Sequence, residues 1–351
     1  MRKGTEFFCF AVLILALAGV ASAQQAFTTT IYFDYAYYLS NDGPVTSAAK
    51  DNFFAFRRAY FTYENKINDN LKFRFRYDAD NTANITSVDF AKGSTKKDDK
   101  LRPFIKHLYF DYAGLIPNSS LKVGMTETLT FKPAEDRWGY RSVAKTLLDG
   151  YKDVTGVDID ATSADLGASL TGSLAKYVRY GLMVSNGSHY SHAENDKWKK
   201  LMAQVHLVPV AGLSLLGYVD YEKQSDTAEA FTWKGDTYFE MVKNLVIGAE
   251  YFVYRNDHHV TSTKERYDIS GLSIFGRYQV ILDKLSLFGR FDTYEPNNKT
   301  GDNKINLLIA GFDWAPVHKS MKIQPNVWIY DYENPAKKDD LIFNLTFFLS
   351  F

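Results

Sequence analysis

Three cations in the sequence alternate with apolar side chains over a short stretch. In the segment LKFRFRYD, Lys72, Arg74 and Arg76 occupy every second position. Successive side chains of a β-strand point to opposite faces, so these three cations share one face if the segment is a strand. Arg58, in the preceding alternating segment, joins the row if the apolar residues of 59–63 point the other way. Such a row of fixed cations attracts anions by electrostatics, without covalent chemistry.

A second set of charges lies in residues 129–162, the longest segment without strand-like alternation. Its apolar residues follow the spacing of a short helix: Tyr140, Val143, Ala144, Leu147, Leu148 and Tyr151. The charged residues of the segment would then project toward water: Lys132, Glu135, Asp136, Arg137, Arg141 and Lys145. Fixed charges beside a narrow opening sort the ions and solutes that pass it. An ordinary solvent-exposed loop is the alternative interpretation.

The histidines of the sequence do not form a pattern typical of an enzyme or a metal site. His107 and His206 are predicted on separate strands, and no nucleophile motif, glycine-rich phosphate loop or zinc signature accompanies them. The histidines of HYSH at 189–192 and the pair His258–His259 fall in predicted loops, without a third ligand at a suitable spacing. We therefore expect no enzymatic activity, no metal and no cofactor.

The elements that must position these charges are β-strands. The chain contains 24 Tyr and 26 Phe, residues that favour strands over helices. Period-two alternation recurs in AYFTYENK, LKFRFRYD, YVRYGLMV, KLMAQVHLV and LSLFGRFD. About seven short turns alternate with about eight long polar loops, which predicts an all-β, antiparallel up-and-down barrel of roughly 16 transmembrane strands. The formal net charge is zero, so no overall basic surface for nucleic acid is expected.

Both ends of the chain indicate export and membrane insertion. A charged start, the apolar run FFCFAVLILALAGV and the small residues of ASAQQ predict a signal peptide over residues 1–23, which leaves a barrel over 24–351. The single cysteine, Cys9, lies within that peptide, so no disulfide is expected. The last segment, LIFNLTFFLSF, alternates up to Phe351 and is expected to pair with AFTTTIYFDYAYYLS, because hydrocarbon leaves no partner for an open sheet edge.

The barrel assigns a direction to the cationic row. A charged side chain that faces lipid near the midplane costs about 2–4 kcal/mol, so Lys72, Arg74 and Arg76 are expected to face the lumen. Acidic residues also fall on predicted inner faces: Glu64, Asp78, Asp111, Asp220, Glu222 and Asp292. A mild preference for anions and a non-selective pore therefore both stay open, with a cation preference as the third alternative.

The combination of a signal peptide, alternating strands and a terminal FNLTFFLSF resembles Gram-negative outer-membrane porins. More narrowly, FRRAYFTYENKINDNLKFRFRYD and HLYFDYAGLIPNSSLKVGMTETLTFKPAEDRWGYRS resemble the phosphate-selective (polyphosphate) porin family. The resemblance implies that segment 129–162, between the fifth and sixth strands, folds inward as a constriction loop, and that lumen arginines and constriction lysines bind the anion. It also implies a homotrimer among outer-membrane lipids and lipopolysaccharide, and recognition of the strand ending at Phe351 by the barrel-assembly machinery.

The function predicted from these features is passive diffusion of small hydrophilic solutes through an outer-membrane porin. A non-conducting barrel that acts as an adhesin or a structural surface protein is the alternative, favoured by Tyr-rich strands and polar loops. Against it, about sixteen strands enclose a lumen that side chains alone do not fill. A channel specific for a hydrophobic or oligosaccharide solute is a third possibility, but it would require a plug or a continuous aromatic slide, and the mature chain begins directly with a strand.

Overall fold

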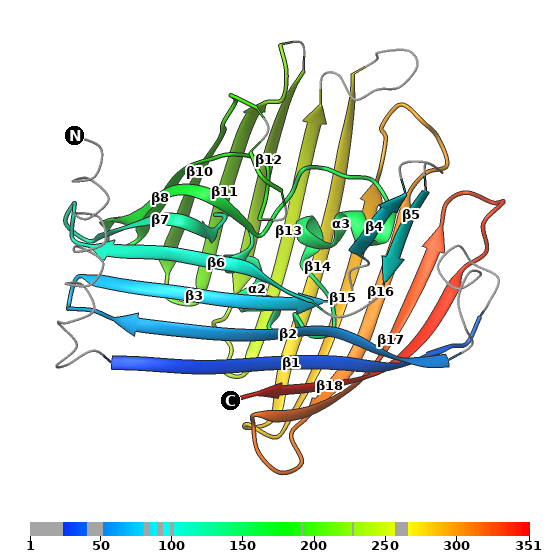
Figure 1. The fold of residues 1–351 in the computed structure, drawn as a ribbon. Coiled ribbons are helices and arrows are strands. Elements are labelled where there is room, and N and C mark those ends of the chain that lie inside the picture. The colour runs from blue at the N-terminus through cyan, green and yellow to red at the C-terminus, as the bar shows by residue number, and fades with distance from the viewer. Residues whose placement is uncertain are drawn as a thin grey trace.

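A closed antiparallel barrel of 16 strands dominates the computed structural model (Figure 1). The structure describes residues 24–40, 52–80, 84–89, 94–98, 102–190, 192–194, 196–226, 228–256 and 266–351. The strands follow one another around the barrel in up-and-down order, so the predicted fold class and strand number are confirmed. The predicted signal peptide, residues 1–23, lies outside the described residues.

The barrel strands have the following bounds in chain order: β1 (Gln24–Tyr38), β2 (Asn52–Lys66), β3 (Leu71–Asp80), β6 (Arg102–Ala113), β7 (Ser119–Glu127), β8 (Ala164–Ala175), β9 (Val178–Ser185), β10 (Lys200–Val210), β11 (Leu213–Lys223), β12 (Glu229–Phe239), β13 (Leu245–Asn256), β14 (Tyr267–Ile281), β15 (Leu285–Glu295), β16 (Ile305–Trp314), β17 (Met321–Tyr332) and β18 (Asp340–Ser350). A separate hairpin, β4 (Asn84–Asp89) and β5 (Ser94–Asp98), lies between β3 and β6 in the chain. Two short helices, α2 (Lys132–Trp138) and α3 (Leu147–Thr155), lie between β7 and β8. Among the described residues, no helix has the length and apolar character needed to cross a membrane.

The first and last strands close the barrel. β1 pairs with β18 in antiparallel register, from Thr30 opposite Ser350 to Tyr38 opposite Ile342. The backbone of Phe351 continues this pairing, since its N–H donates to the Thr29 carbonyl at 3.0 Å. Figure 1 shows the C-terminus beside β1. The closure predicted from the alternation of the terminal segment is therefore confirmed, and both strand ends lie at one end of the barrel.

Short turns and long connections alternate around the barrel, as predicted. The turns 67–70, 114–118, 176–177, 211–212, 240–244, 282–284 and 315–320 lie at one end, which we call the short-turn end. The longer connections lie at the opposite, long-loop end, and the connection that carries α2 and α3 joins the fifth and sixth barrel strands. The hairpin β4–β5 belongs to the connection from β3 to β6, which the sequence indicated only as a polar loop.

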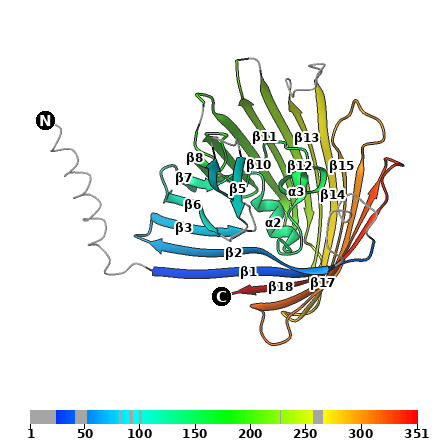
Figure 2. The same ribbon diagram turned by 45° about the vertical axis from the view of Figure 1, so that its right-hand side comes forward.

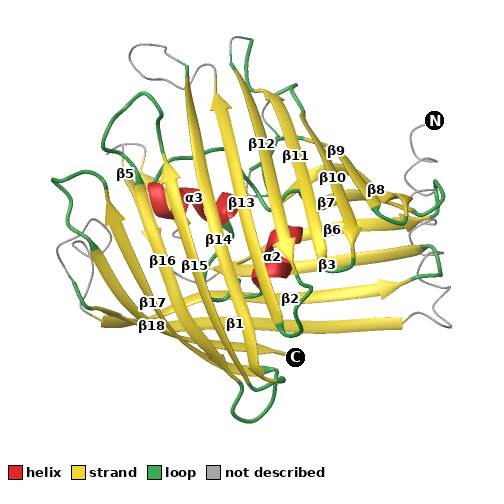
Figure 3. Ribbon diagram, turned by 180° about the vertical axis from the view of Figure 1, so that it is seen from behind, coloured by secondary structure: helices red, strands yellow, loops and turns green. Residues whose placement is uncertain are grey.

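Side chains alternate between the two faces of each strand, and the faces differ in chemistry. In β12, Thr232, Lys234 and Asp236 are buried on the inner face, whereas Phe231 and Trp233 are exposed on the outer face. The other strands also place apolar side chains on the outer face, and Figure 3 shows the wall that β11 to β17 form. Their inner faces carry both charged side chains and, from β12 to β18, a cluster of buried apolar side chains. An apolar exterior around buried charges is the reverse of a soluble sandwich, whose apolar faces meet in a core.

Candidate pore constriction

The connection between β7 and β8 lies inside the barrel (Figures 2 and 3). Its buried apolar residues form one cluster with inward-facing residues of β12 to β18. Trp138, at the end of α2, contacts the rings of Phe275 and Phe288 edge-on, with centroids 5.6 and 5.8 Å away. Tyr151, in α3, contacts Phe252 in the same manner at 5.4 Å. Aromatic packing therefore holds the loop against one side of the barrel, which we call the anchoring wall, β12 to β17.

The single short helix predicted from the spacing of residues 140–151 is wrong. α2 ends earlier, at Trp138, because Gly139 adopts a left-handed conformation with φ of 74° and its N–H bonds to the Glu135 carbonyl. Residues 140–146 are irregular, and α3 begins only at Leu147. The six apolar residues on which the prediction was based are nevertheless all buried. Their spacing therefore indicated contact with the wall and not one continuous helix.

Backbone carbonyls of the irregular segment are bound by arginines of the barrel, which explains why the segment is not helical. Arg57 of β2 donates from Nη1 to the carbonyls of Ser142 and Val143, at 2.8 and 3.0 Å. Arg290 of β15 donates to the carbonyl of Lys145. Carbonyls inside a helix accept from their own helix and cannot serve two walls in this way. The segment between the helices is thus fixed to both β2 and β15.

Among the described residues, several cavities border the loop, and the two larger ones adjoin each other. The wide cavity, about 450 Å³, lies between the loop and strands β1 to β3 and β15 to β17; Arg57, Arg58 and Trp328 are among its lining residues. The narrow cavity, about 230 Å³, lies between the loop and strands β2, β3, β6 and β7. Arg141 lines both cavities, so its guanidinium stands where they adjoin.

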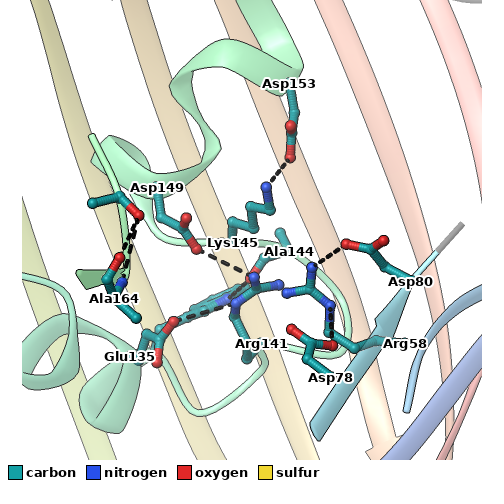
Figure 4. Close-up of polar contacts among 12 residues, drawn as sticks. Arg58, Asp78, Asp80, Glu135, Arg141, Ala144, Lys145, Asp149, Asp153 and Ala164 are labelled. Atoms are coloured by element: carbon teal, nitrogen blue, oxygen red, sulfur yellow. Dashed lines mark hydrogen bonds and ion pairs between the residues drawn. The ribbon is translucent and has the colours of Figure 1, made fainter. Parts of the chain in front are cut away.

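Two carboxylates of the loop hold Arg141 in place (Figure 4). Its Nε lies 3.2 Å from Glu135 Oε1, and its Nη2 lies 3.2 Å from Asp149 Oδ2. The carboxylates come from α2 and α3, so Arg141 connects the two helices across the irregular segment. This arrangement fixes a cation where the two cavities adjoin, and the two carboxylates of the loop offset its charge.

The two carboxylates differ in how firmly they hold a negative charge. Burial raises the pKa of Glu135, and the nearby Arg141 guanidinium offsets this only in part. Burial also acts to raise the pKa of Asp149, but there the attraction of Arg141 and Lys145 outweighs it, so that the pKa of Asp149 is below its ordinary value. Asp149 is therefore the permanent counter-ion of Arg141, and Glu135 is the partner that accepts a proton first.

Facing the loop, strands β2, β3 and β6 form a cationic surface that we call the open wall. Arg58 contacts Asp78 at 3.3 Å and Asp80 at 2.9 Å (Figure 4). Asp78 is shared, because Lys106 also lies near it, at 3.6 Å. Asp78 and Asp80 thus offset the charges of Arg58 and Lys106, so the uncompensated positive charge of this wall lies at another cation, Arg76.

Arg76 is the cation of the open wall with the least compensation. Its Nε donates to Thr62 Oγ1 at 2.8 Å, and its guanidinium lies over the Tyr60 ring, 4.8 Å from the centroid. Within the part of the chain that the structure describes, no carboxylate forms an ion pair with it. Arg76 lines the narrow cavity together with Arg74, whose guanidinium is 3.4 Å from both Glu64 and Glu127. A solute anion in this cavity would meet a guanidinium whose charge is not already matched.

Two cations of the site escaped the sequence analysis because they sit on β-bulges. Tyr32 pairs with Arg58 and the next residue of β1 pairs with Phe56, so Arg57 is the unpaired extra residue of β2. In β6, the register against β3 shifts between His107 and Ile105, which leaves Lys106 unpaired. A bulge breaks strict alternation, so consecutive residues both reach the interior. The adjacent arginines of the FRR segment were the available signal for the first bulge.

The remaining predicted site residues take different positions. Lys132 pairs with Asp136 at 2.7 Å, with both side chains largely exposed. Arg137 turns toward the anchoring wall, over the Tyr238 ring and 3.4 Å from Glu240, and Lys145 pairs with Asp153 at 2.8 Å. Lys72 lies near the short-turn end of β3, opposite Asp111 and Lys66, and lines neither cavity.

The histidines do not assemble into a site. His107 lines the narrow cavity, and His206 is buried on β10. Across the described ranges, no group of three or more His, Cys, Asp or Glu residues is arranged to hold a metal ion. The pair His258–His259 lies outside the described residues.

Solved structures with the same fold come from bacterial outer membranes. The outer-membrane channel DcaP of Acinetobacter baumannii matches with a TM-score of 0.63 at 13% identity, over 94% of this chain and 98% of that one. An anion-selective porin from Comamonas acidovorans matches with a TM-score of 0.66 at 8% identity, over 94% and 100%. The trimer form of OmpT, an outer membrane protein of Vibrio cholerae, matches with a TM-score of 0.61 at 12% identity, over 94% and 99%.

These similarities establish the fold of outer-membrane porins for the chain. No protein-family model matches the sequence, and no curated protein matches it either. At identities of 8–13%, shared architecture carries no information about individual site residues. The function of the passage therefore has to be argued from the side chains that line it.

Proposed function

We propose that the protein is an outer-membrane porin, a passive water-filled channel for small hydrophilic solutes. The observation that carries this proposal is a closed 16-strand barrel with an apolar exterior, a charged interior and one connection folded into its lumen. A barrel of this strand number is too wide for its own side chains to fill, so water occupies what the loop leaves free. The wide and narrow cavities, which adjoin at Arg141, are the described parts of that path.

The charges beside the loop favour a mild preference for anions, including phosphate-like anions. Arg58, Arg74, Arg76 and Lys106 face the loop from the open wall, and Arg141 faces them from the loop. Among the described residues, Arg76 has no carboxylate in an ion pair and Lys106 has one, Asp78. On the anchoring wall, by contrast, Lys234 pairs with two carboxylates. Zero net charge over the whole chain limits the preference, because distant acidic residues contribute to the same potential.

The expected environment follows from the same proposal. The signal peptide 1–23 directs export, outer-membrane lipids and lipopolysaccharide surround the apolar exterior, and the barrel-assembly machinery recognises the strand that ends at Phe351. A homotrimer is proposed because a protein of the same fold is described in a trimer form. The phosphate-selective subfamily remains part of the proposal, resting on the two motif segments that include the open wall.

The reversal potential across a salt gradient tests this function. Wild type and the triple variant Lys72→Glu, Arg74→Glu, Arg76→Glu would be compared in planar bilayers, and we expect the variant to shift toward cations. The matched control reverses three lysines of short turns, Lys243, Lys284 and Lys319, which lie outside both cavities. Equal reversal potentials for wild type and the open-wall variant would rule out conduction along that wall.

A non-conducting barrel that serves adhesion or surface structure is the competing function. It requires that the loop block the lumen completely. Single-channel recordings of purified, folded protein separate the two functions directly: stable open-channel currents support the porin, and a folded barrel that never conducts supports the alternative.

A further inference from the structure

The wide cavity combines aromatic rings with guanidinium groups. Trp328 and Tyr330 of β17 are among its lining residues, and so are Arg57 of β2 and Arg141 of the loop. Its volume of about 450 Å³ lies within the roughly 300–1,000 Å³ that is typical of small-molecule sites. The passage of simple ions makes no use of the aromatic part of this lining.

The two rings belong to a longer series on the inner face of β17. Trp328, Tyr330 and Tyr332 occupy every second position, and the ring centroids are 6.1 Å apart in the first pair and 6.3 Å apart in the second. We call these three residues the aromatic row. Trp328 Nε1 donates to Asn326 Oδ1 and the Tyr332 hydroxyl donates to Asp340 Oδ2, both at 2.8 Å. With these polar atoms paired, the row offers mainly ring surface between the long-loop end and the wide cavity.

Arg57 retains an unused edge of its guanidinium. Its Nη1 lies 3.1 Å from Asp34 Oδ2 and donates to the carbonyls of Ser142 and Val143. Among the described residues, no acceptor forms a hydrogen bond with its Nε or Nη2. These two atoms form one edge of the planar group, which can bind a carboxylate through two parallel hydrogen bonds. The Arg57 side chain is 26% exposed, so a solute in the cavity can reach it.

Arg141 also retains one unused group. Its Nε and Nη2 are held by Glu135 and Asp149, and within the part of the chain that the structure describes nothing accepts from its Nη1. A guanidinium has five N–H donors and no acceptor, so each unused nitrogen can only donate. The two arginines therefore present charged donors to the same cavity.

The carboxylates of the wide cavity already bind cations. Asp80 accepts from Arg58 Nη2 at 2.9 Å, and Asp153 Oδ2 lies 2.8 Å from Lys145 Nζ. A cationic solute would have to displace one of these partners, whereas an anion finds donors that are still available. The cavity is therefore suited to a solute that carries both a ring and a negative charge.

We propose that the wide cavity binds aromatic carboxylates, with the ring against Trp328 and Tyr330 and the carboxylate on the unused edge of Arg57. Arg141 contributes a further donor from its Nη1. The inference deepens the proposed function, on which it rests, by naming a class of solute for one part of the passage. The aromatic row gives the ring of such a solute a surface to follow from the long-loop end to the site.

Two other classes of solute fit the wide cavity less well. A small inorganic anion uses no ring surface and is served by the narrow cavity, where the Arg76 guanidinium already lies over the Tyr60 ring. A neutral sugar also packs against rings, but its hydroxyl groups are neutral acceptors for the arginines. Hydrogen bonds between an ionised donor and an ionised acceptor are roughly twice as strong as neutral ones, which favours the carboxylate.

Fluorine NMR of para-fluorobenzoate with the folded protein in detergent tests the proposal without requiring a current. We expect the wild type to broaden the probe resonance beyond the background of protein-free micelles, and unlabelled benzoate to reverse this. Para-fluorobenzamide has the ring without the charge and should bind about tenfold more weakly, because it loses the charge-assisted hydrogen bonds. Acetate has the charge without the ring and should compete only at about tenfold higher concentration than benzoate.

Substitutions of Trp328 test the ring side of the site. Trp328→Leu should weaken binding of para-fluorobenzoate about tenfold, while Trp328→Phe, which keeps a ring, should bind it nearly as the wild type does. Trp233→Leu makes the same change on the outer face and should leave binding unchanged. The charged side is tested on the solute and not on Arg57, because Arg57 also holds the loop.

Three results would overturn the site: wild-type binding in Trp328→Leu with the folded mobility on gels, equal binding of the amide, or equal competition by acetate. Any of them in a protein that conducts would leave the channel function intact. A protein that binds the probe as expected but never conducts in planar bilayers would instead refute the channel and leave the site.

Discussion

The anchoring wall and the open wall use the same residue types in opposite ways. On the anchoring wall, Lys234 lies 2.6 Å from Asp236 and 3.0 Å from Glu250, and all three side chains are at most 1% exposed. On the open wall, the Arg74 side chain is 20% exposed, and Arg76 has a hydroxyl and a ring as its partners. The first arrangement neutralises charge inside a packed surface, and the second leaves charge facing water.

The difference shows that lumen charges alone do not define a permeation path. Lys234 and Arg290 of the anchoring wall are matched by buried carboxylates, and the carbonyl of Lys145 in the loop also binds Arg290. Such pairs stabilise the barrel and contribute little net field, whereas partly paired cations in open space set the local potential. Mutations on the two walls should therefore fall into different classes, with stability affected on one and permeation on the other.

The largest expected effect is the loss of stability on removing Lys234. Lys234→Met leaves Asp236 and Glu250 buried together without their cation, which should cost about 3–5 kcal/mol. Urea-induced unfolding in detergent, followed by the mobility shift of the folded barrel on gels, measures this cost. Arg76→Met is the matched control on the open wall and should cost about 1 kcal/mol or less, as for a cation without a buried carboxylate partner. If the two variants lost the same free energy of unfolding, the proposed difference between the walls would be wrong.

Loosening the loop from the anchoring wall should change conductance next most strongly. Trp138→Ala removes an indole that is fully buried against Phe275 and Phe288 and that donates to the Ala144 carbonyl at 3.0 Å. The lost packing is about 3–5 kcal/mol at a fully buried tryptophan, part of which relaxation of the loop recovers. We expect higher single-channel conductance and frequent transitions between current levels, recorded in planar bilayers. Trp233→Ala, on the outer face, should leave the current unchanged.

A smaller effect is expected where the open wall holds the loop. Arg57→Gln removes the Nη1 group that donates to the carbonyls of both Ser142 and Val143 and leaves both without their donor, at about 1–3 kcal/mol. Open-channel current noise should rise while mean conductance changes little, because the aromatic contacts of α2 and α3 remain. Arg57→Lys keeps the charge but replaces the planar guanidinium with an ammonium on a flexible stem, so the current noise should also rise in this variant. If the current noise of Arg57→Lys equalled that of the wild type, the positive charge, and not the shape of the guanidinium, would hold the loop.

The sequence predicted the barrel more completely than the site, for a physical reason. Alternation, loop lengths and the terminal segment ending at Phe351 arise because whole strands contact lipid. A single irregular position does not change these patterns. The constriction depends on such positions. Arg57 and Lys106 reach the interior through bulges, and α3 begins only at Leu147, although the spacing rule predicted a helix from Tyr140. Their partners are distant in sequence, so local patterns do not encode them.

The smallest expected effect is a pH dependence of selectivity that arises between the two walls, at Glu135. Because burial raises its pKa, Glu135 accepts a proton over a range of pH that lies above the ordinary range of a glutamate. Arg141 then keeps only Asp149, whose pKa is lowered, and the passage becomes more positive. Anion preference, read as the reversal potential in a salt gradient, should therefore increase on acidification through this range. Glu135→Gln should show the acidic selectivity at neutral pH and no further change on acidification; a variant that still shifts would place the titrating group elsewhere.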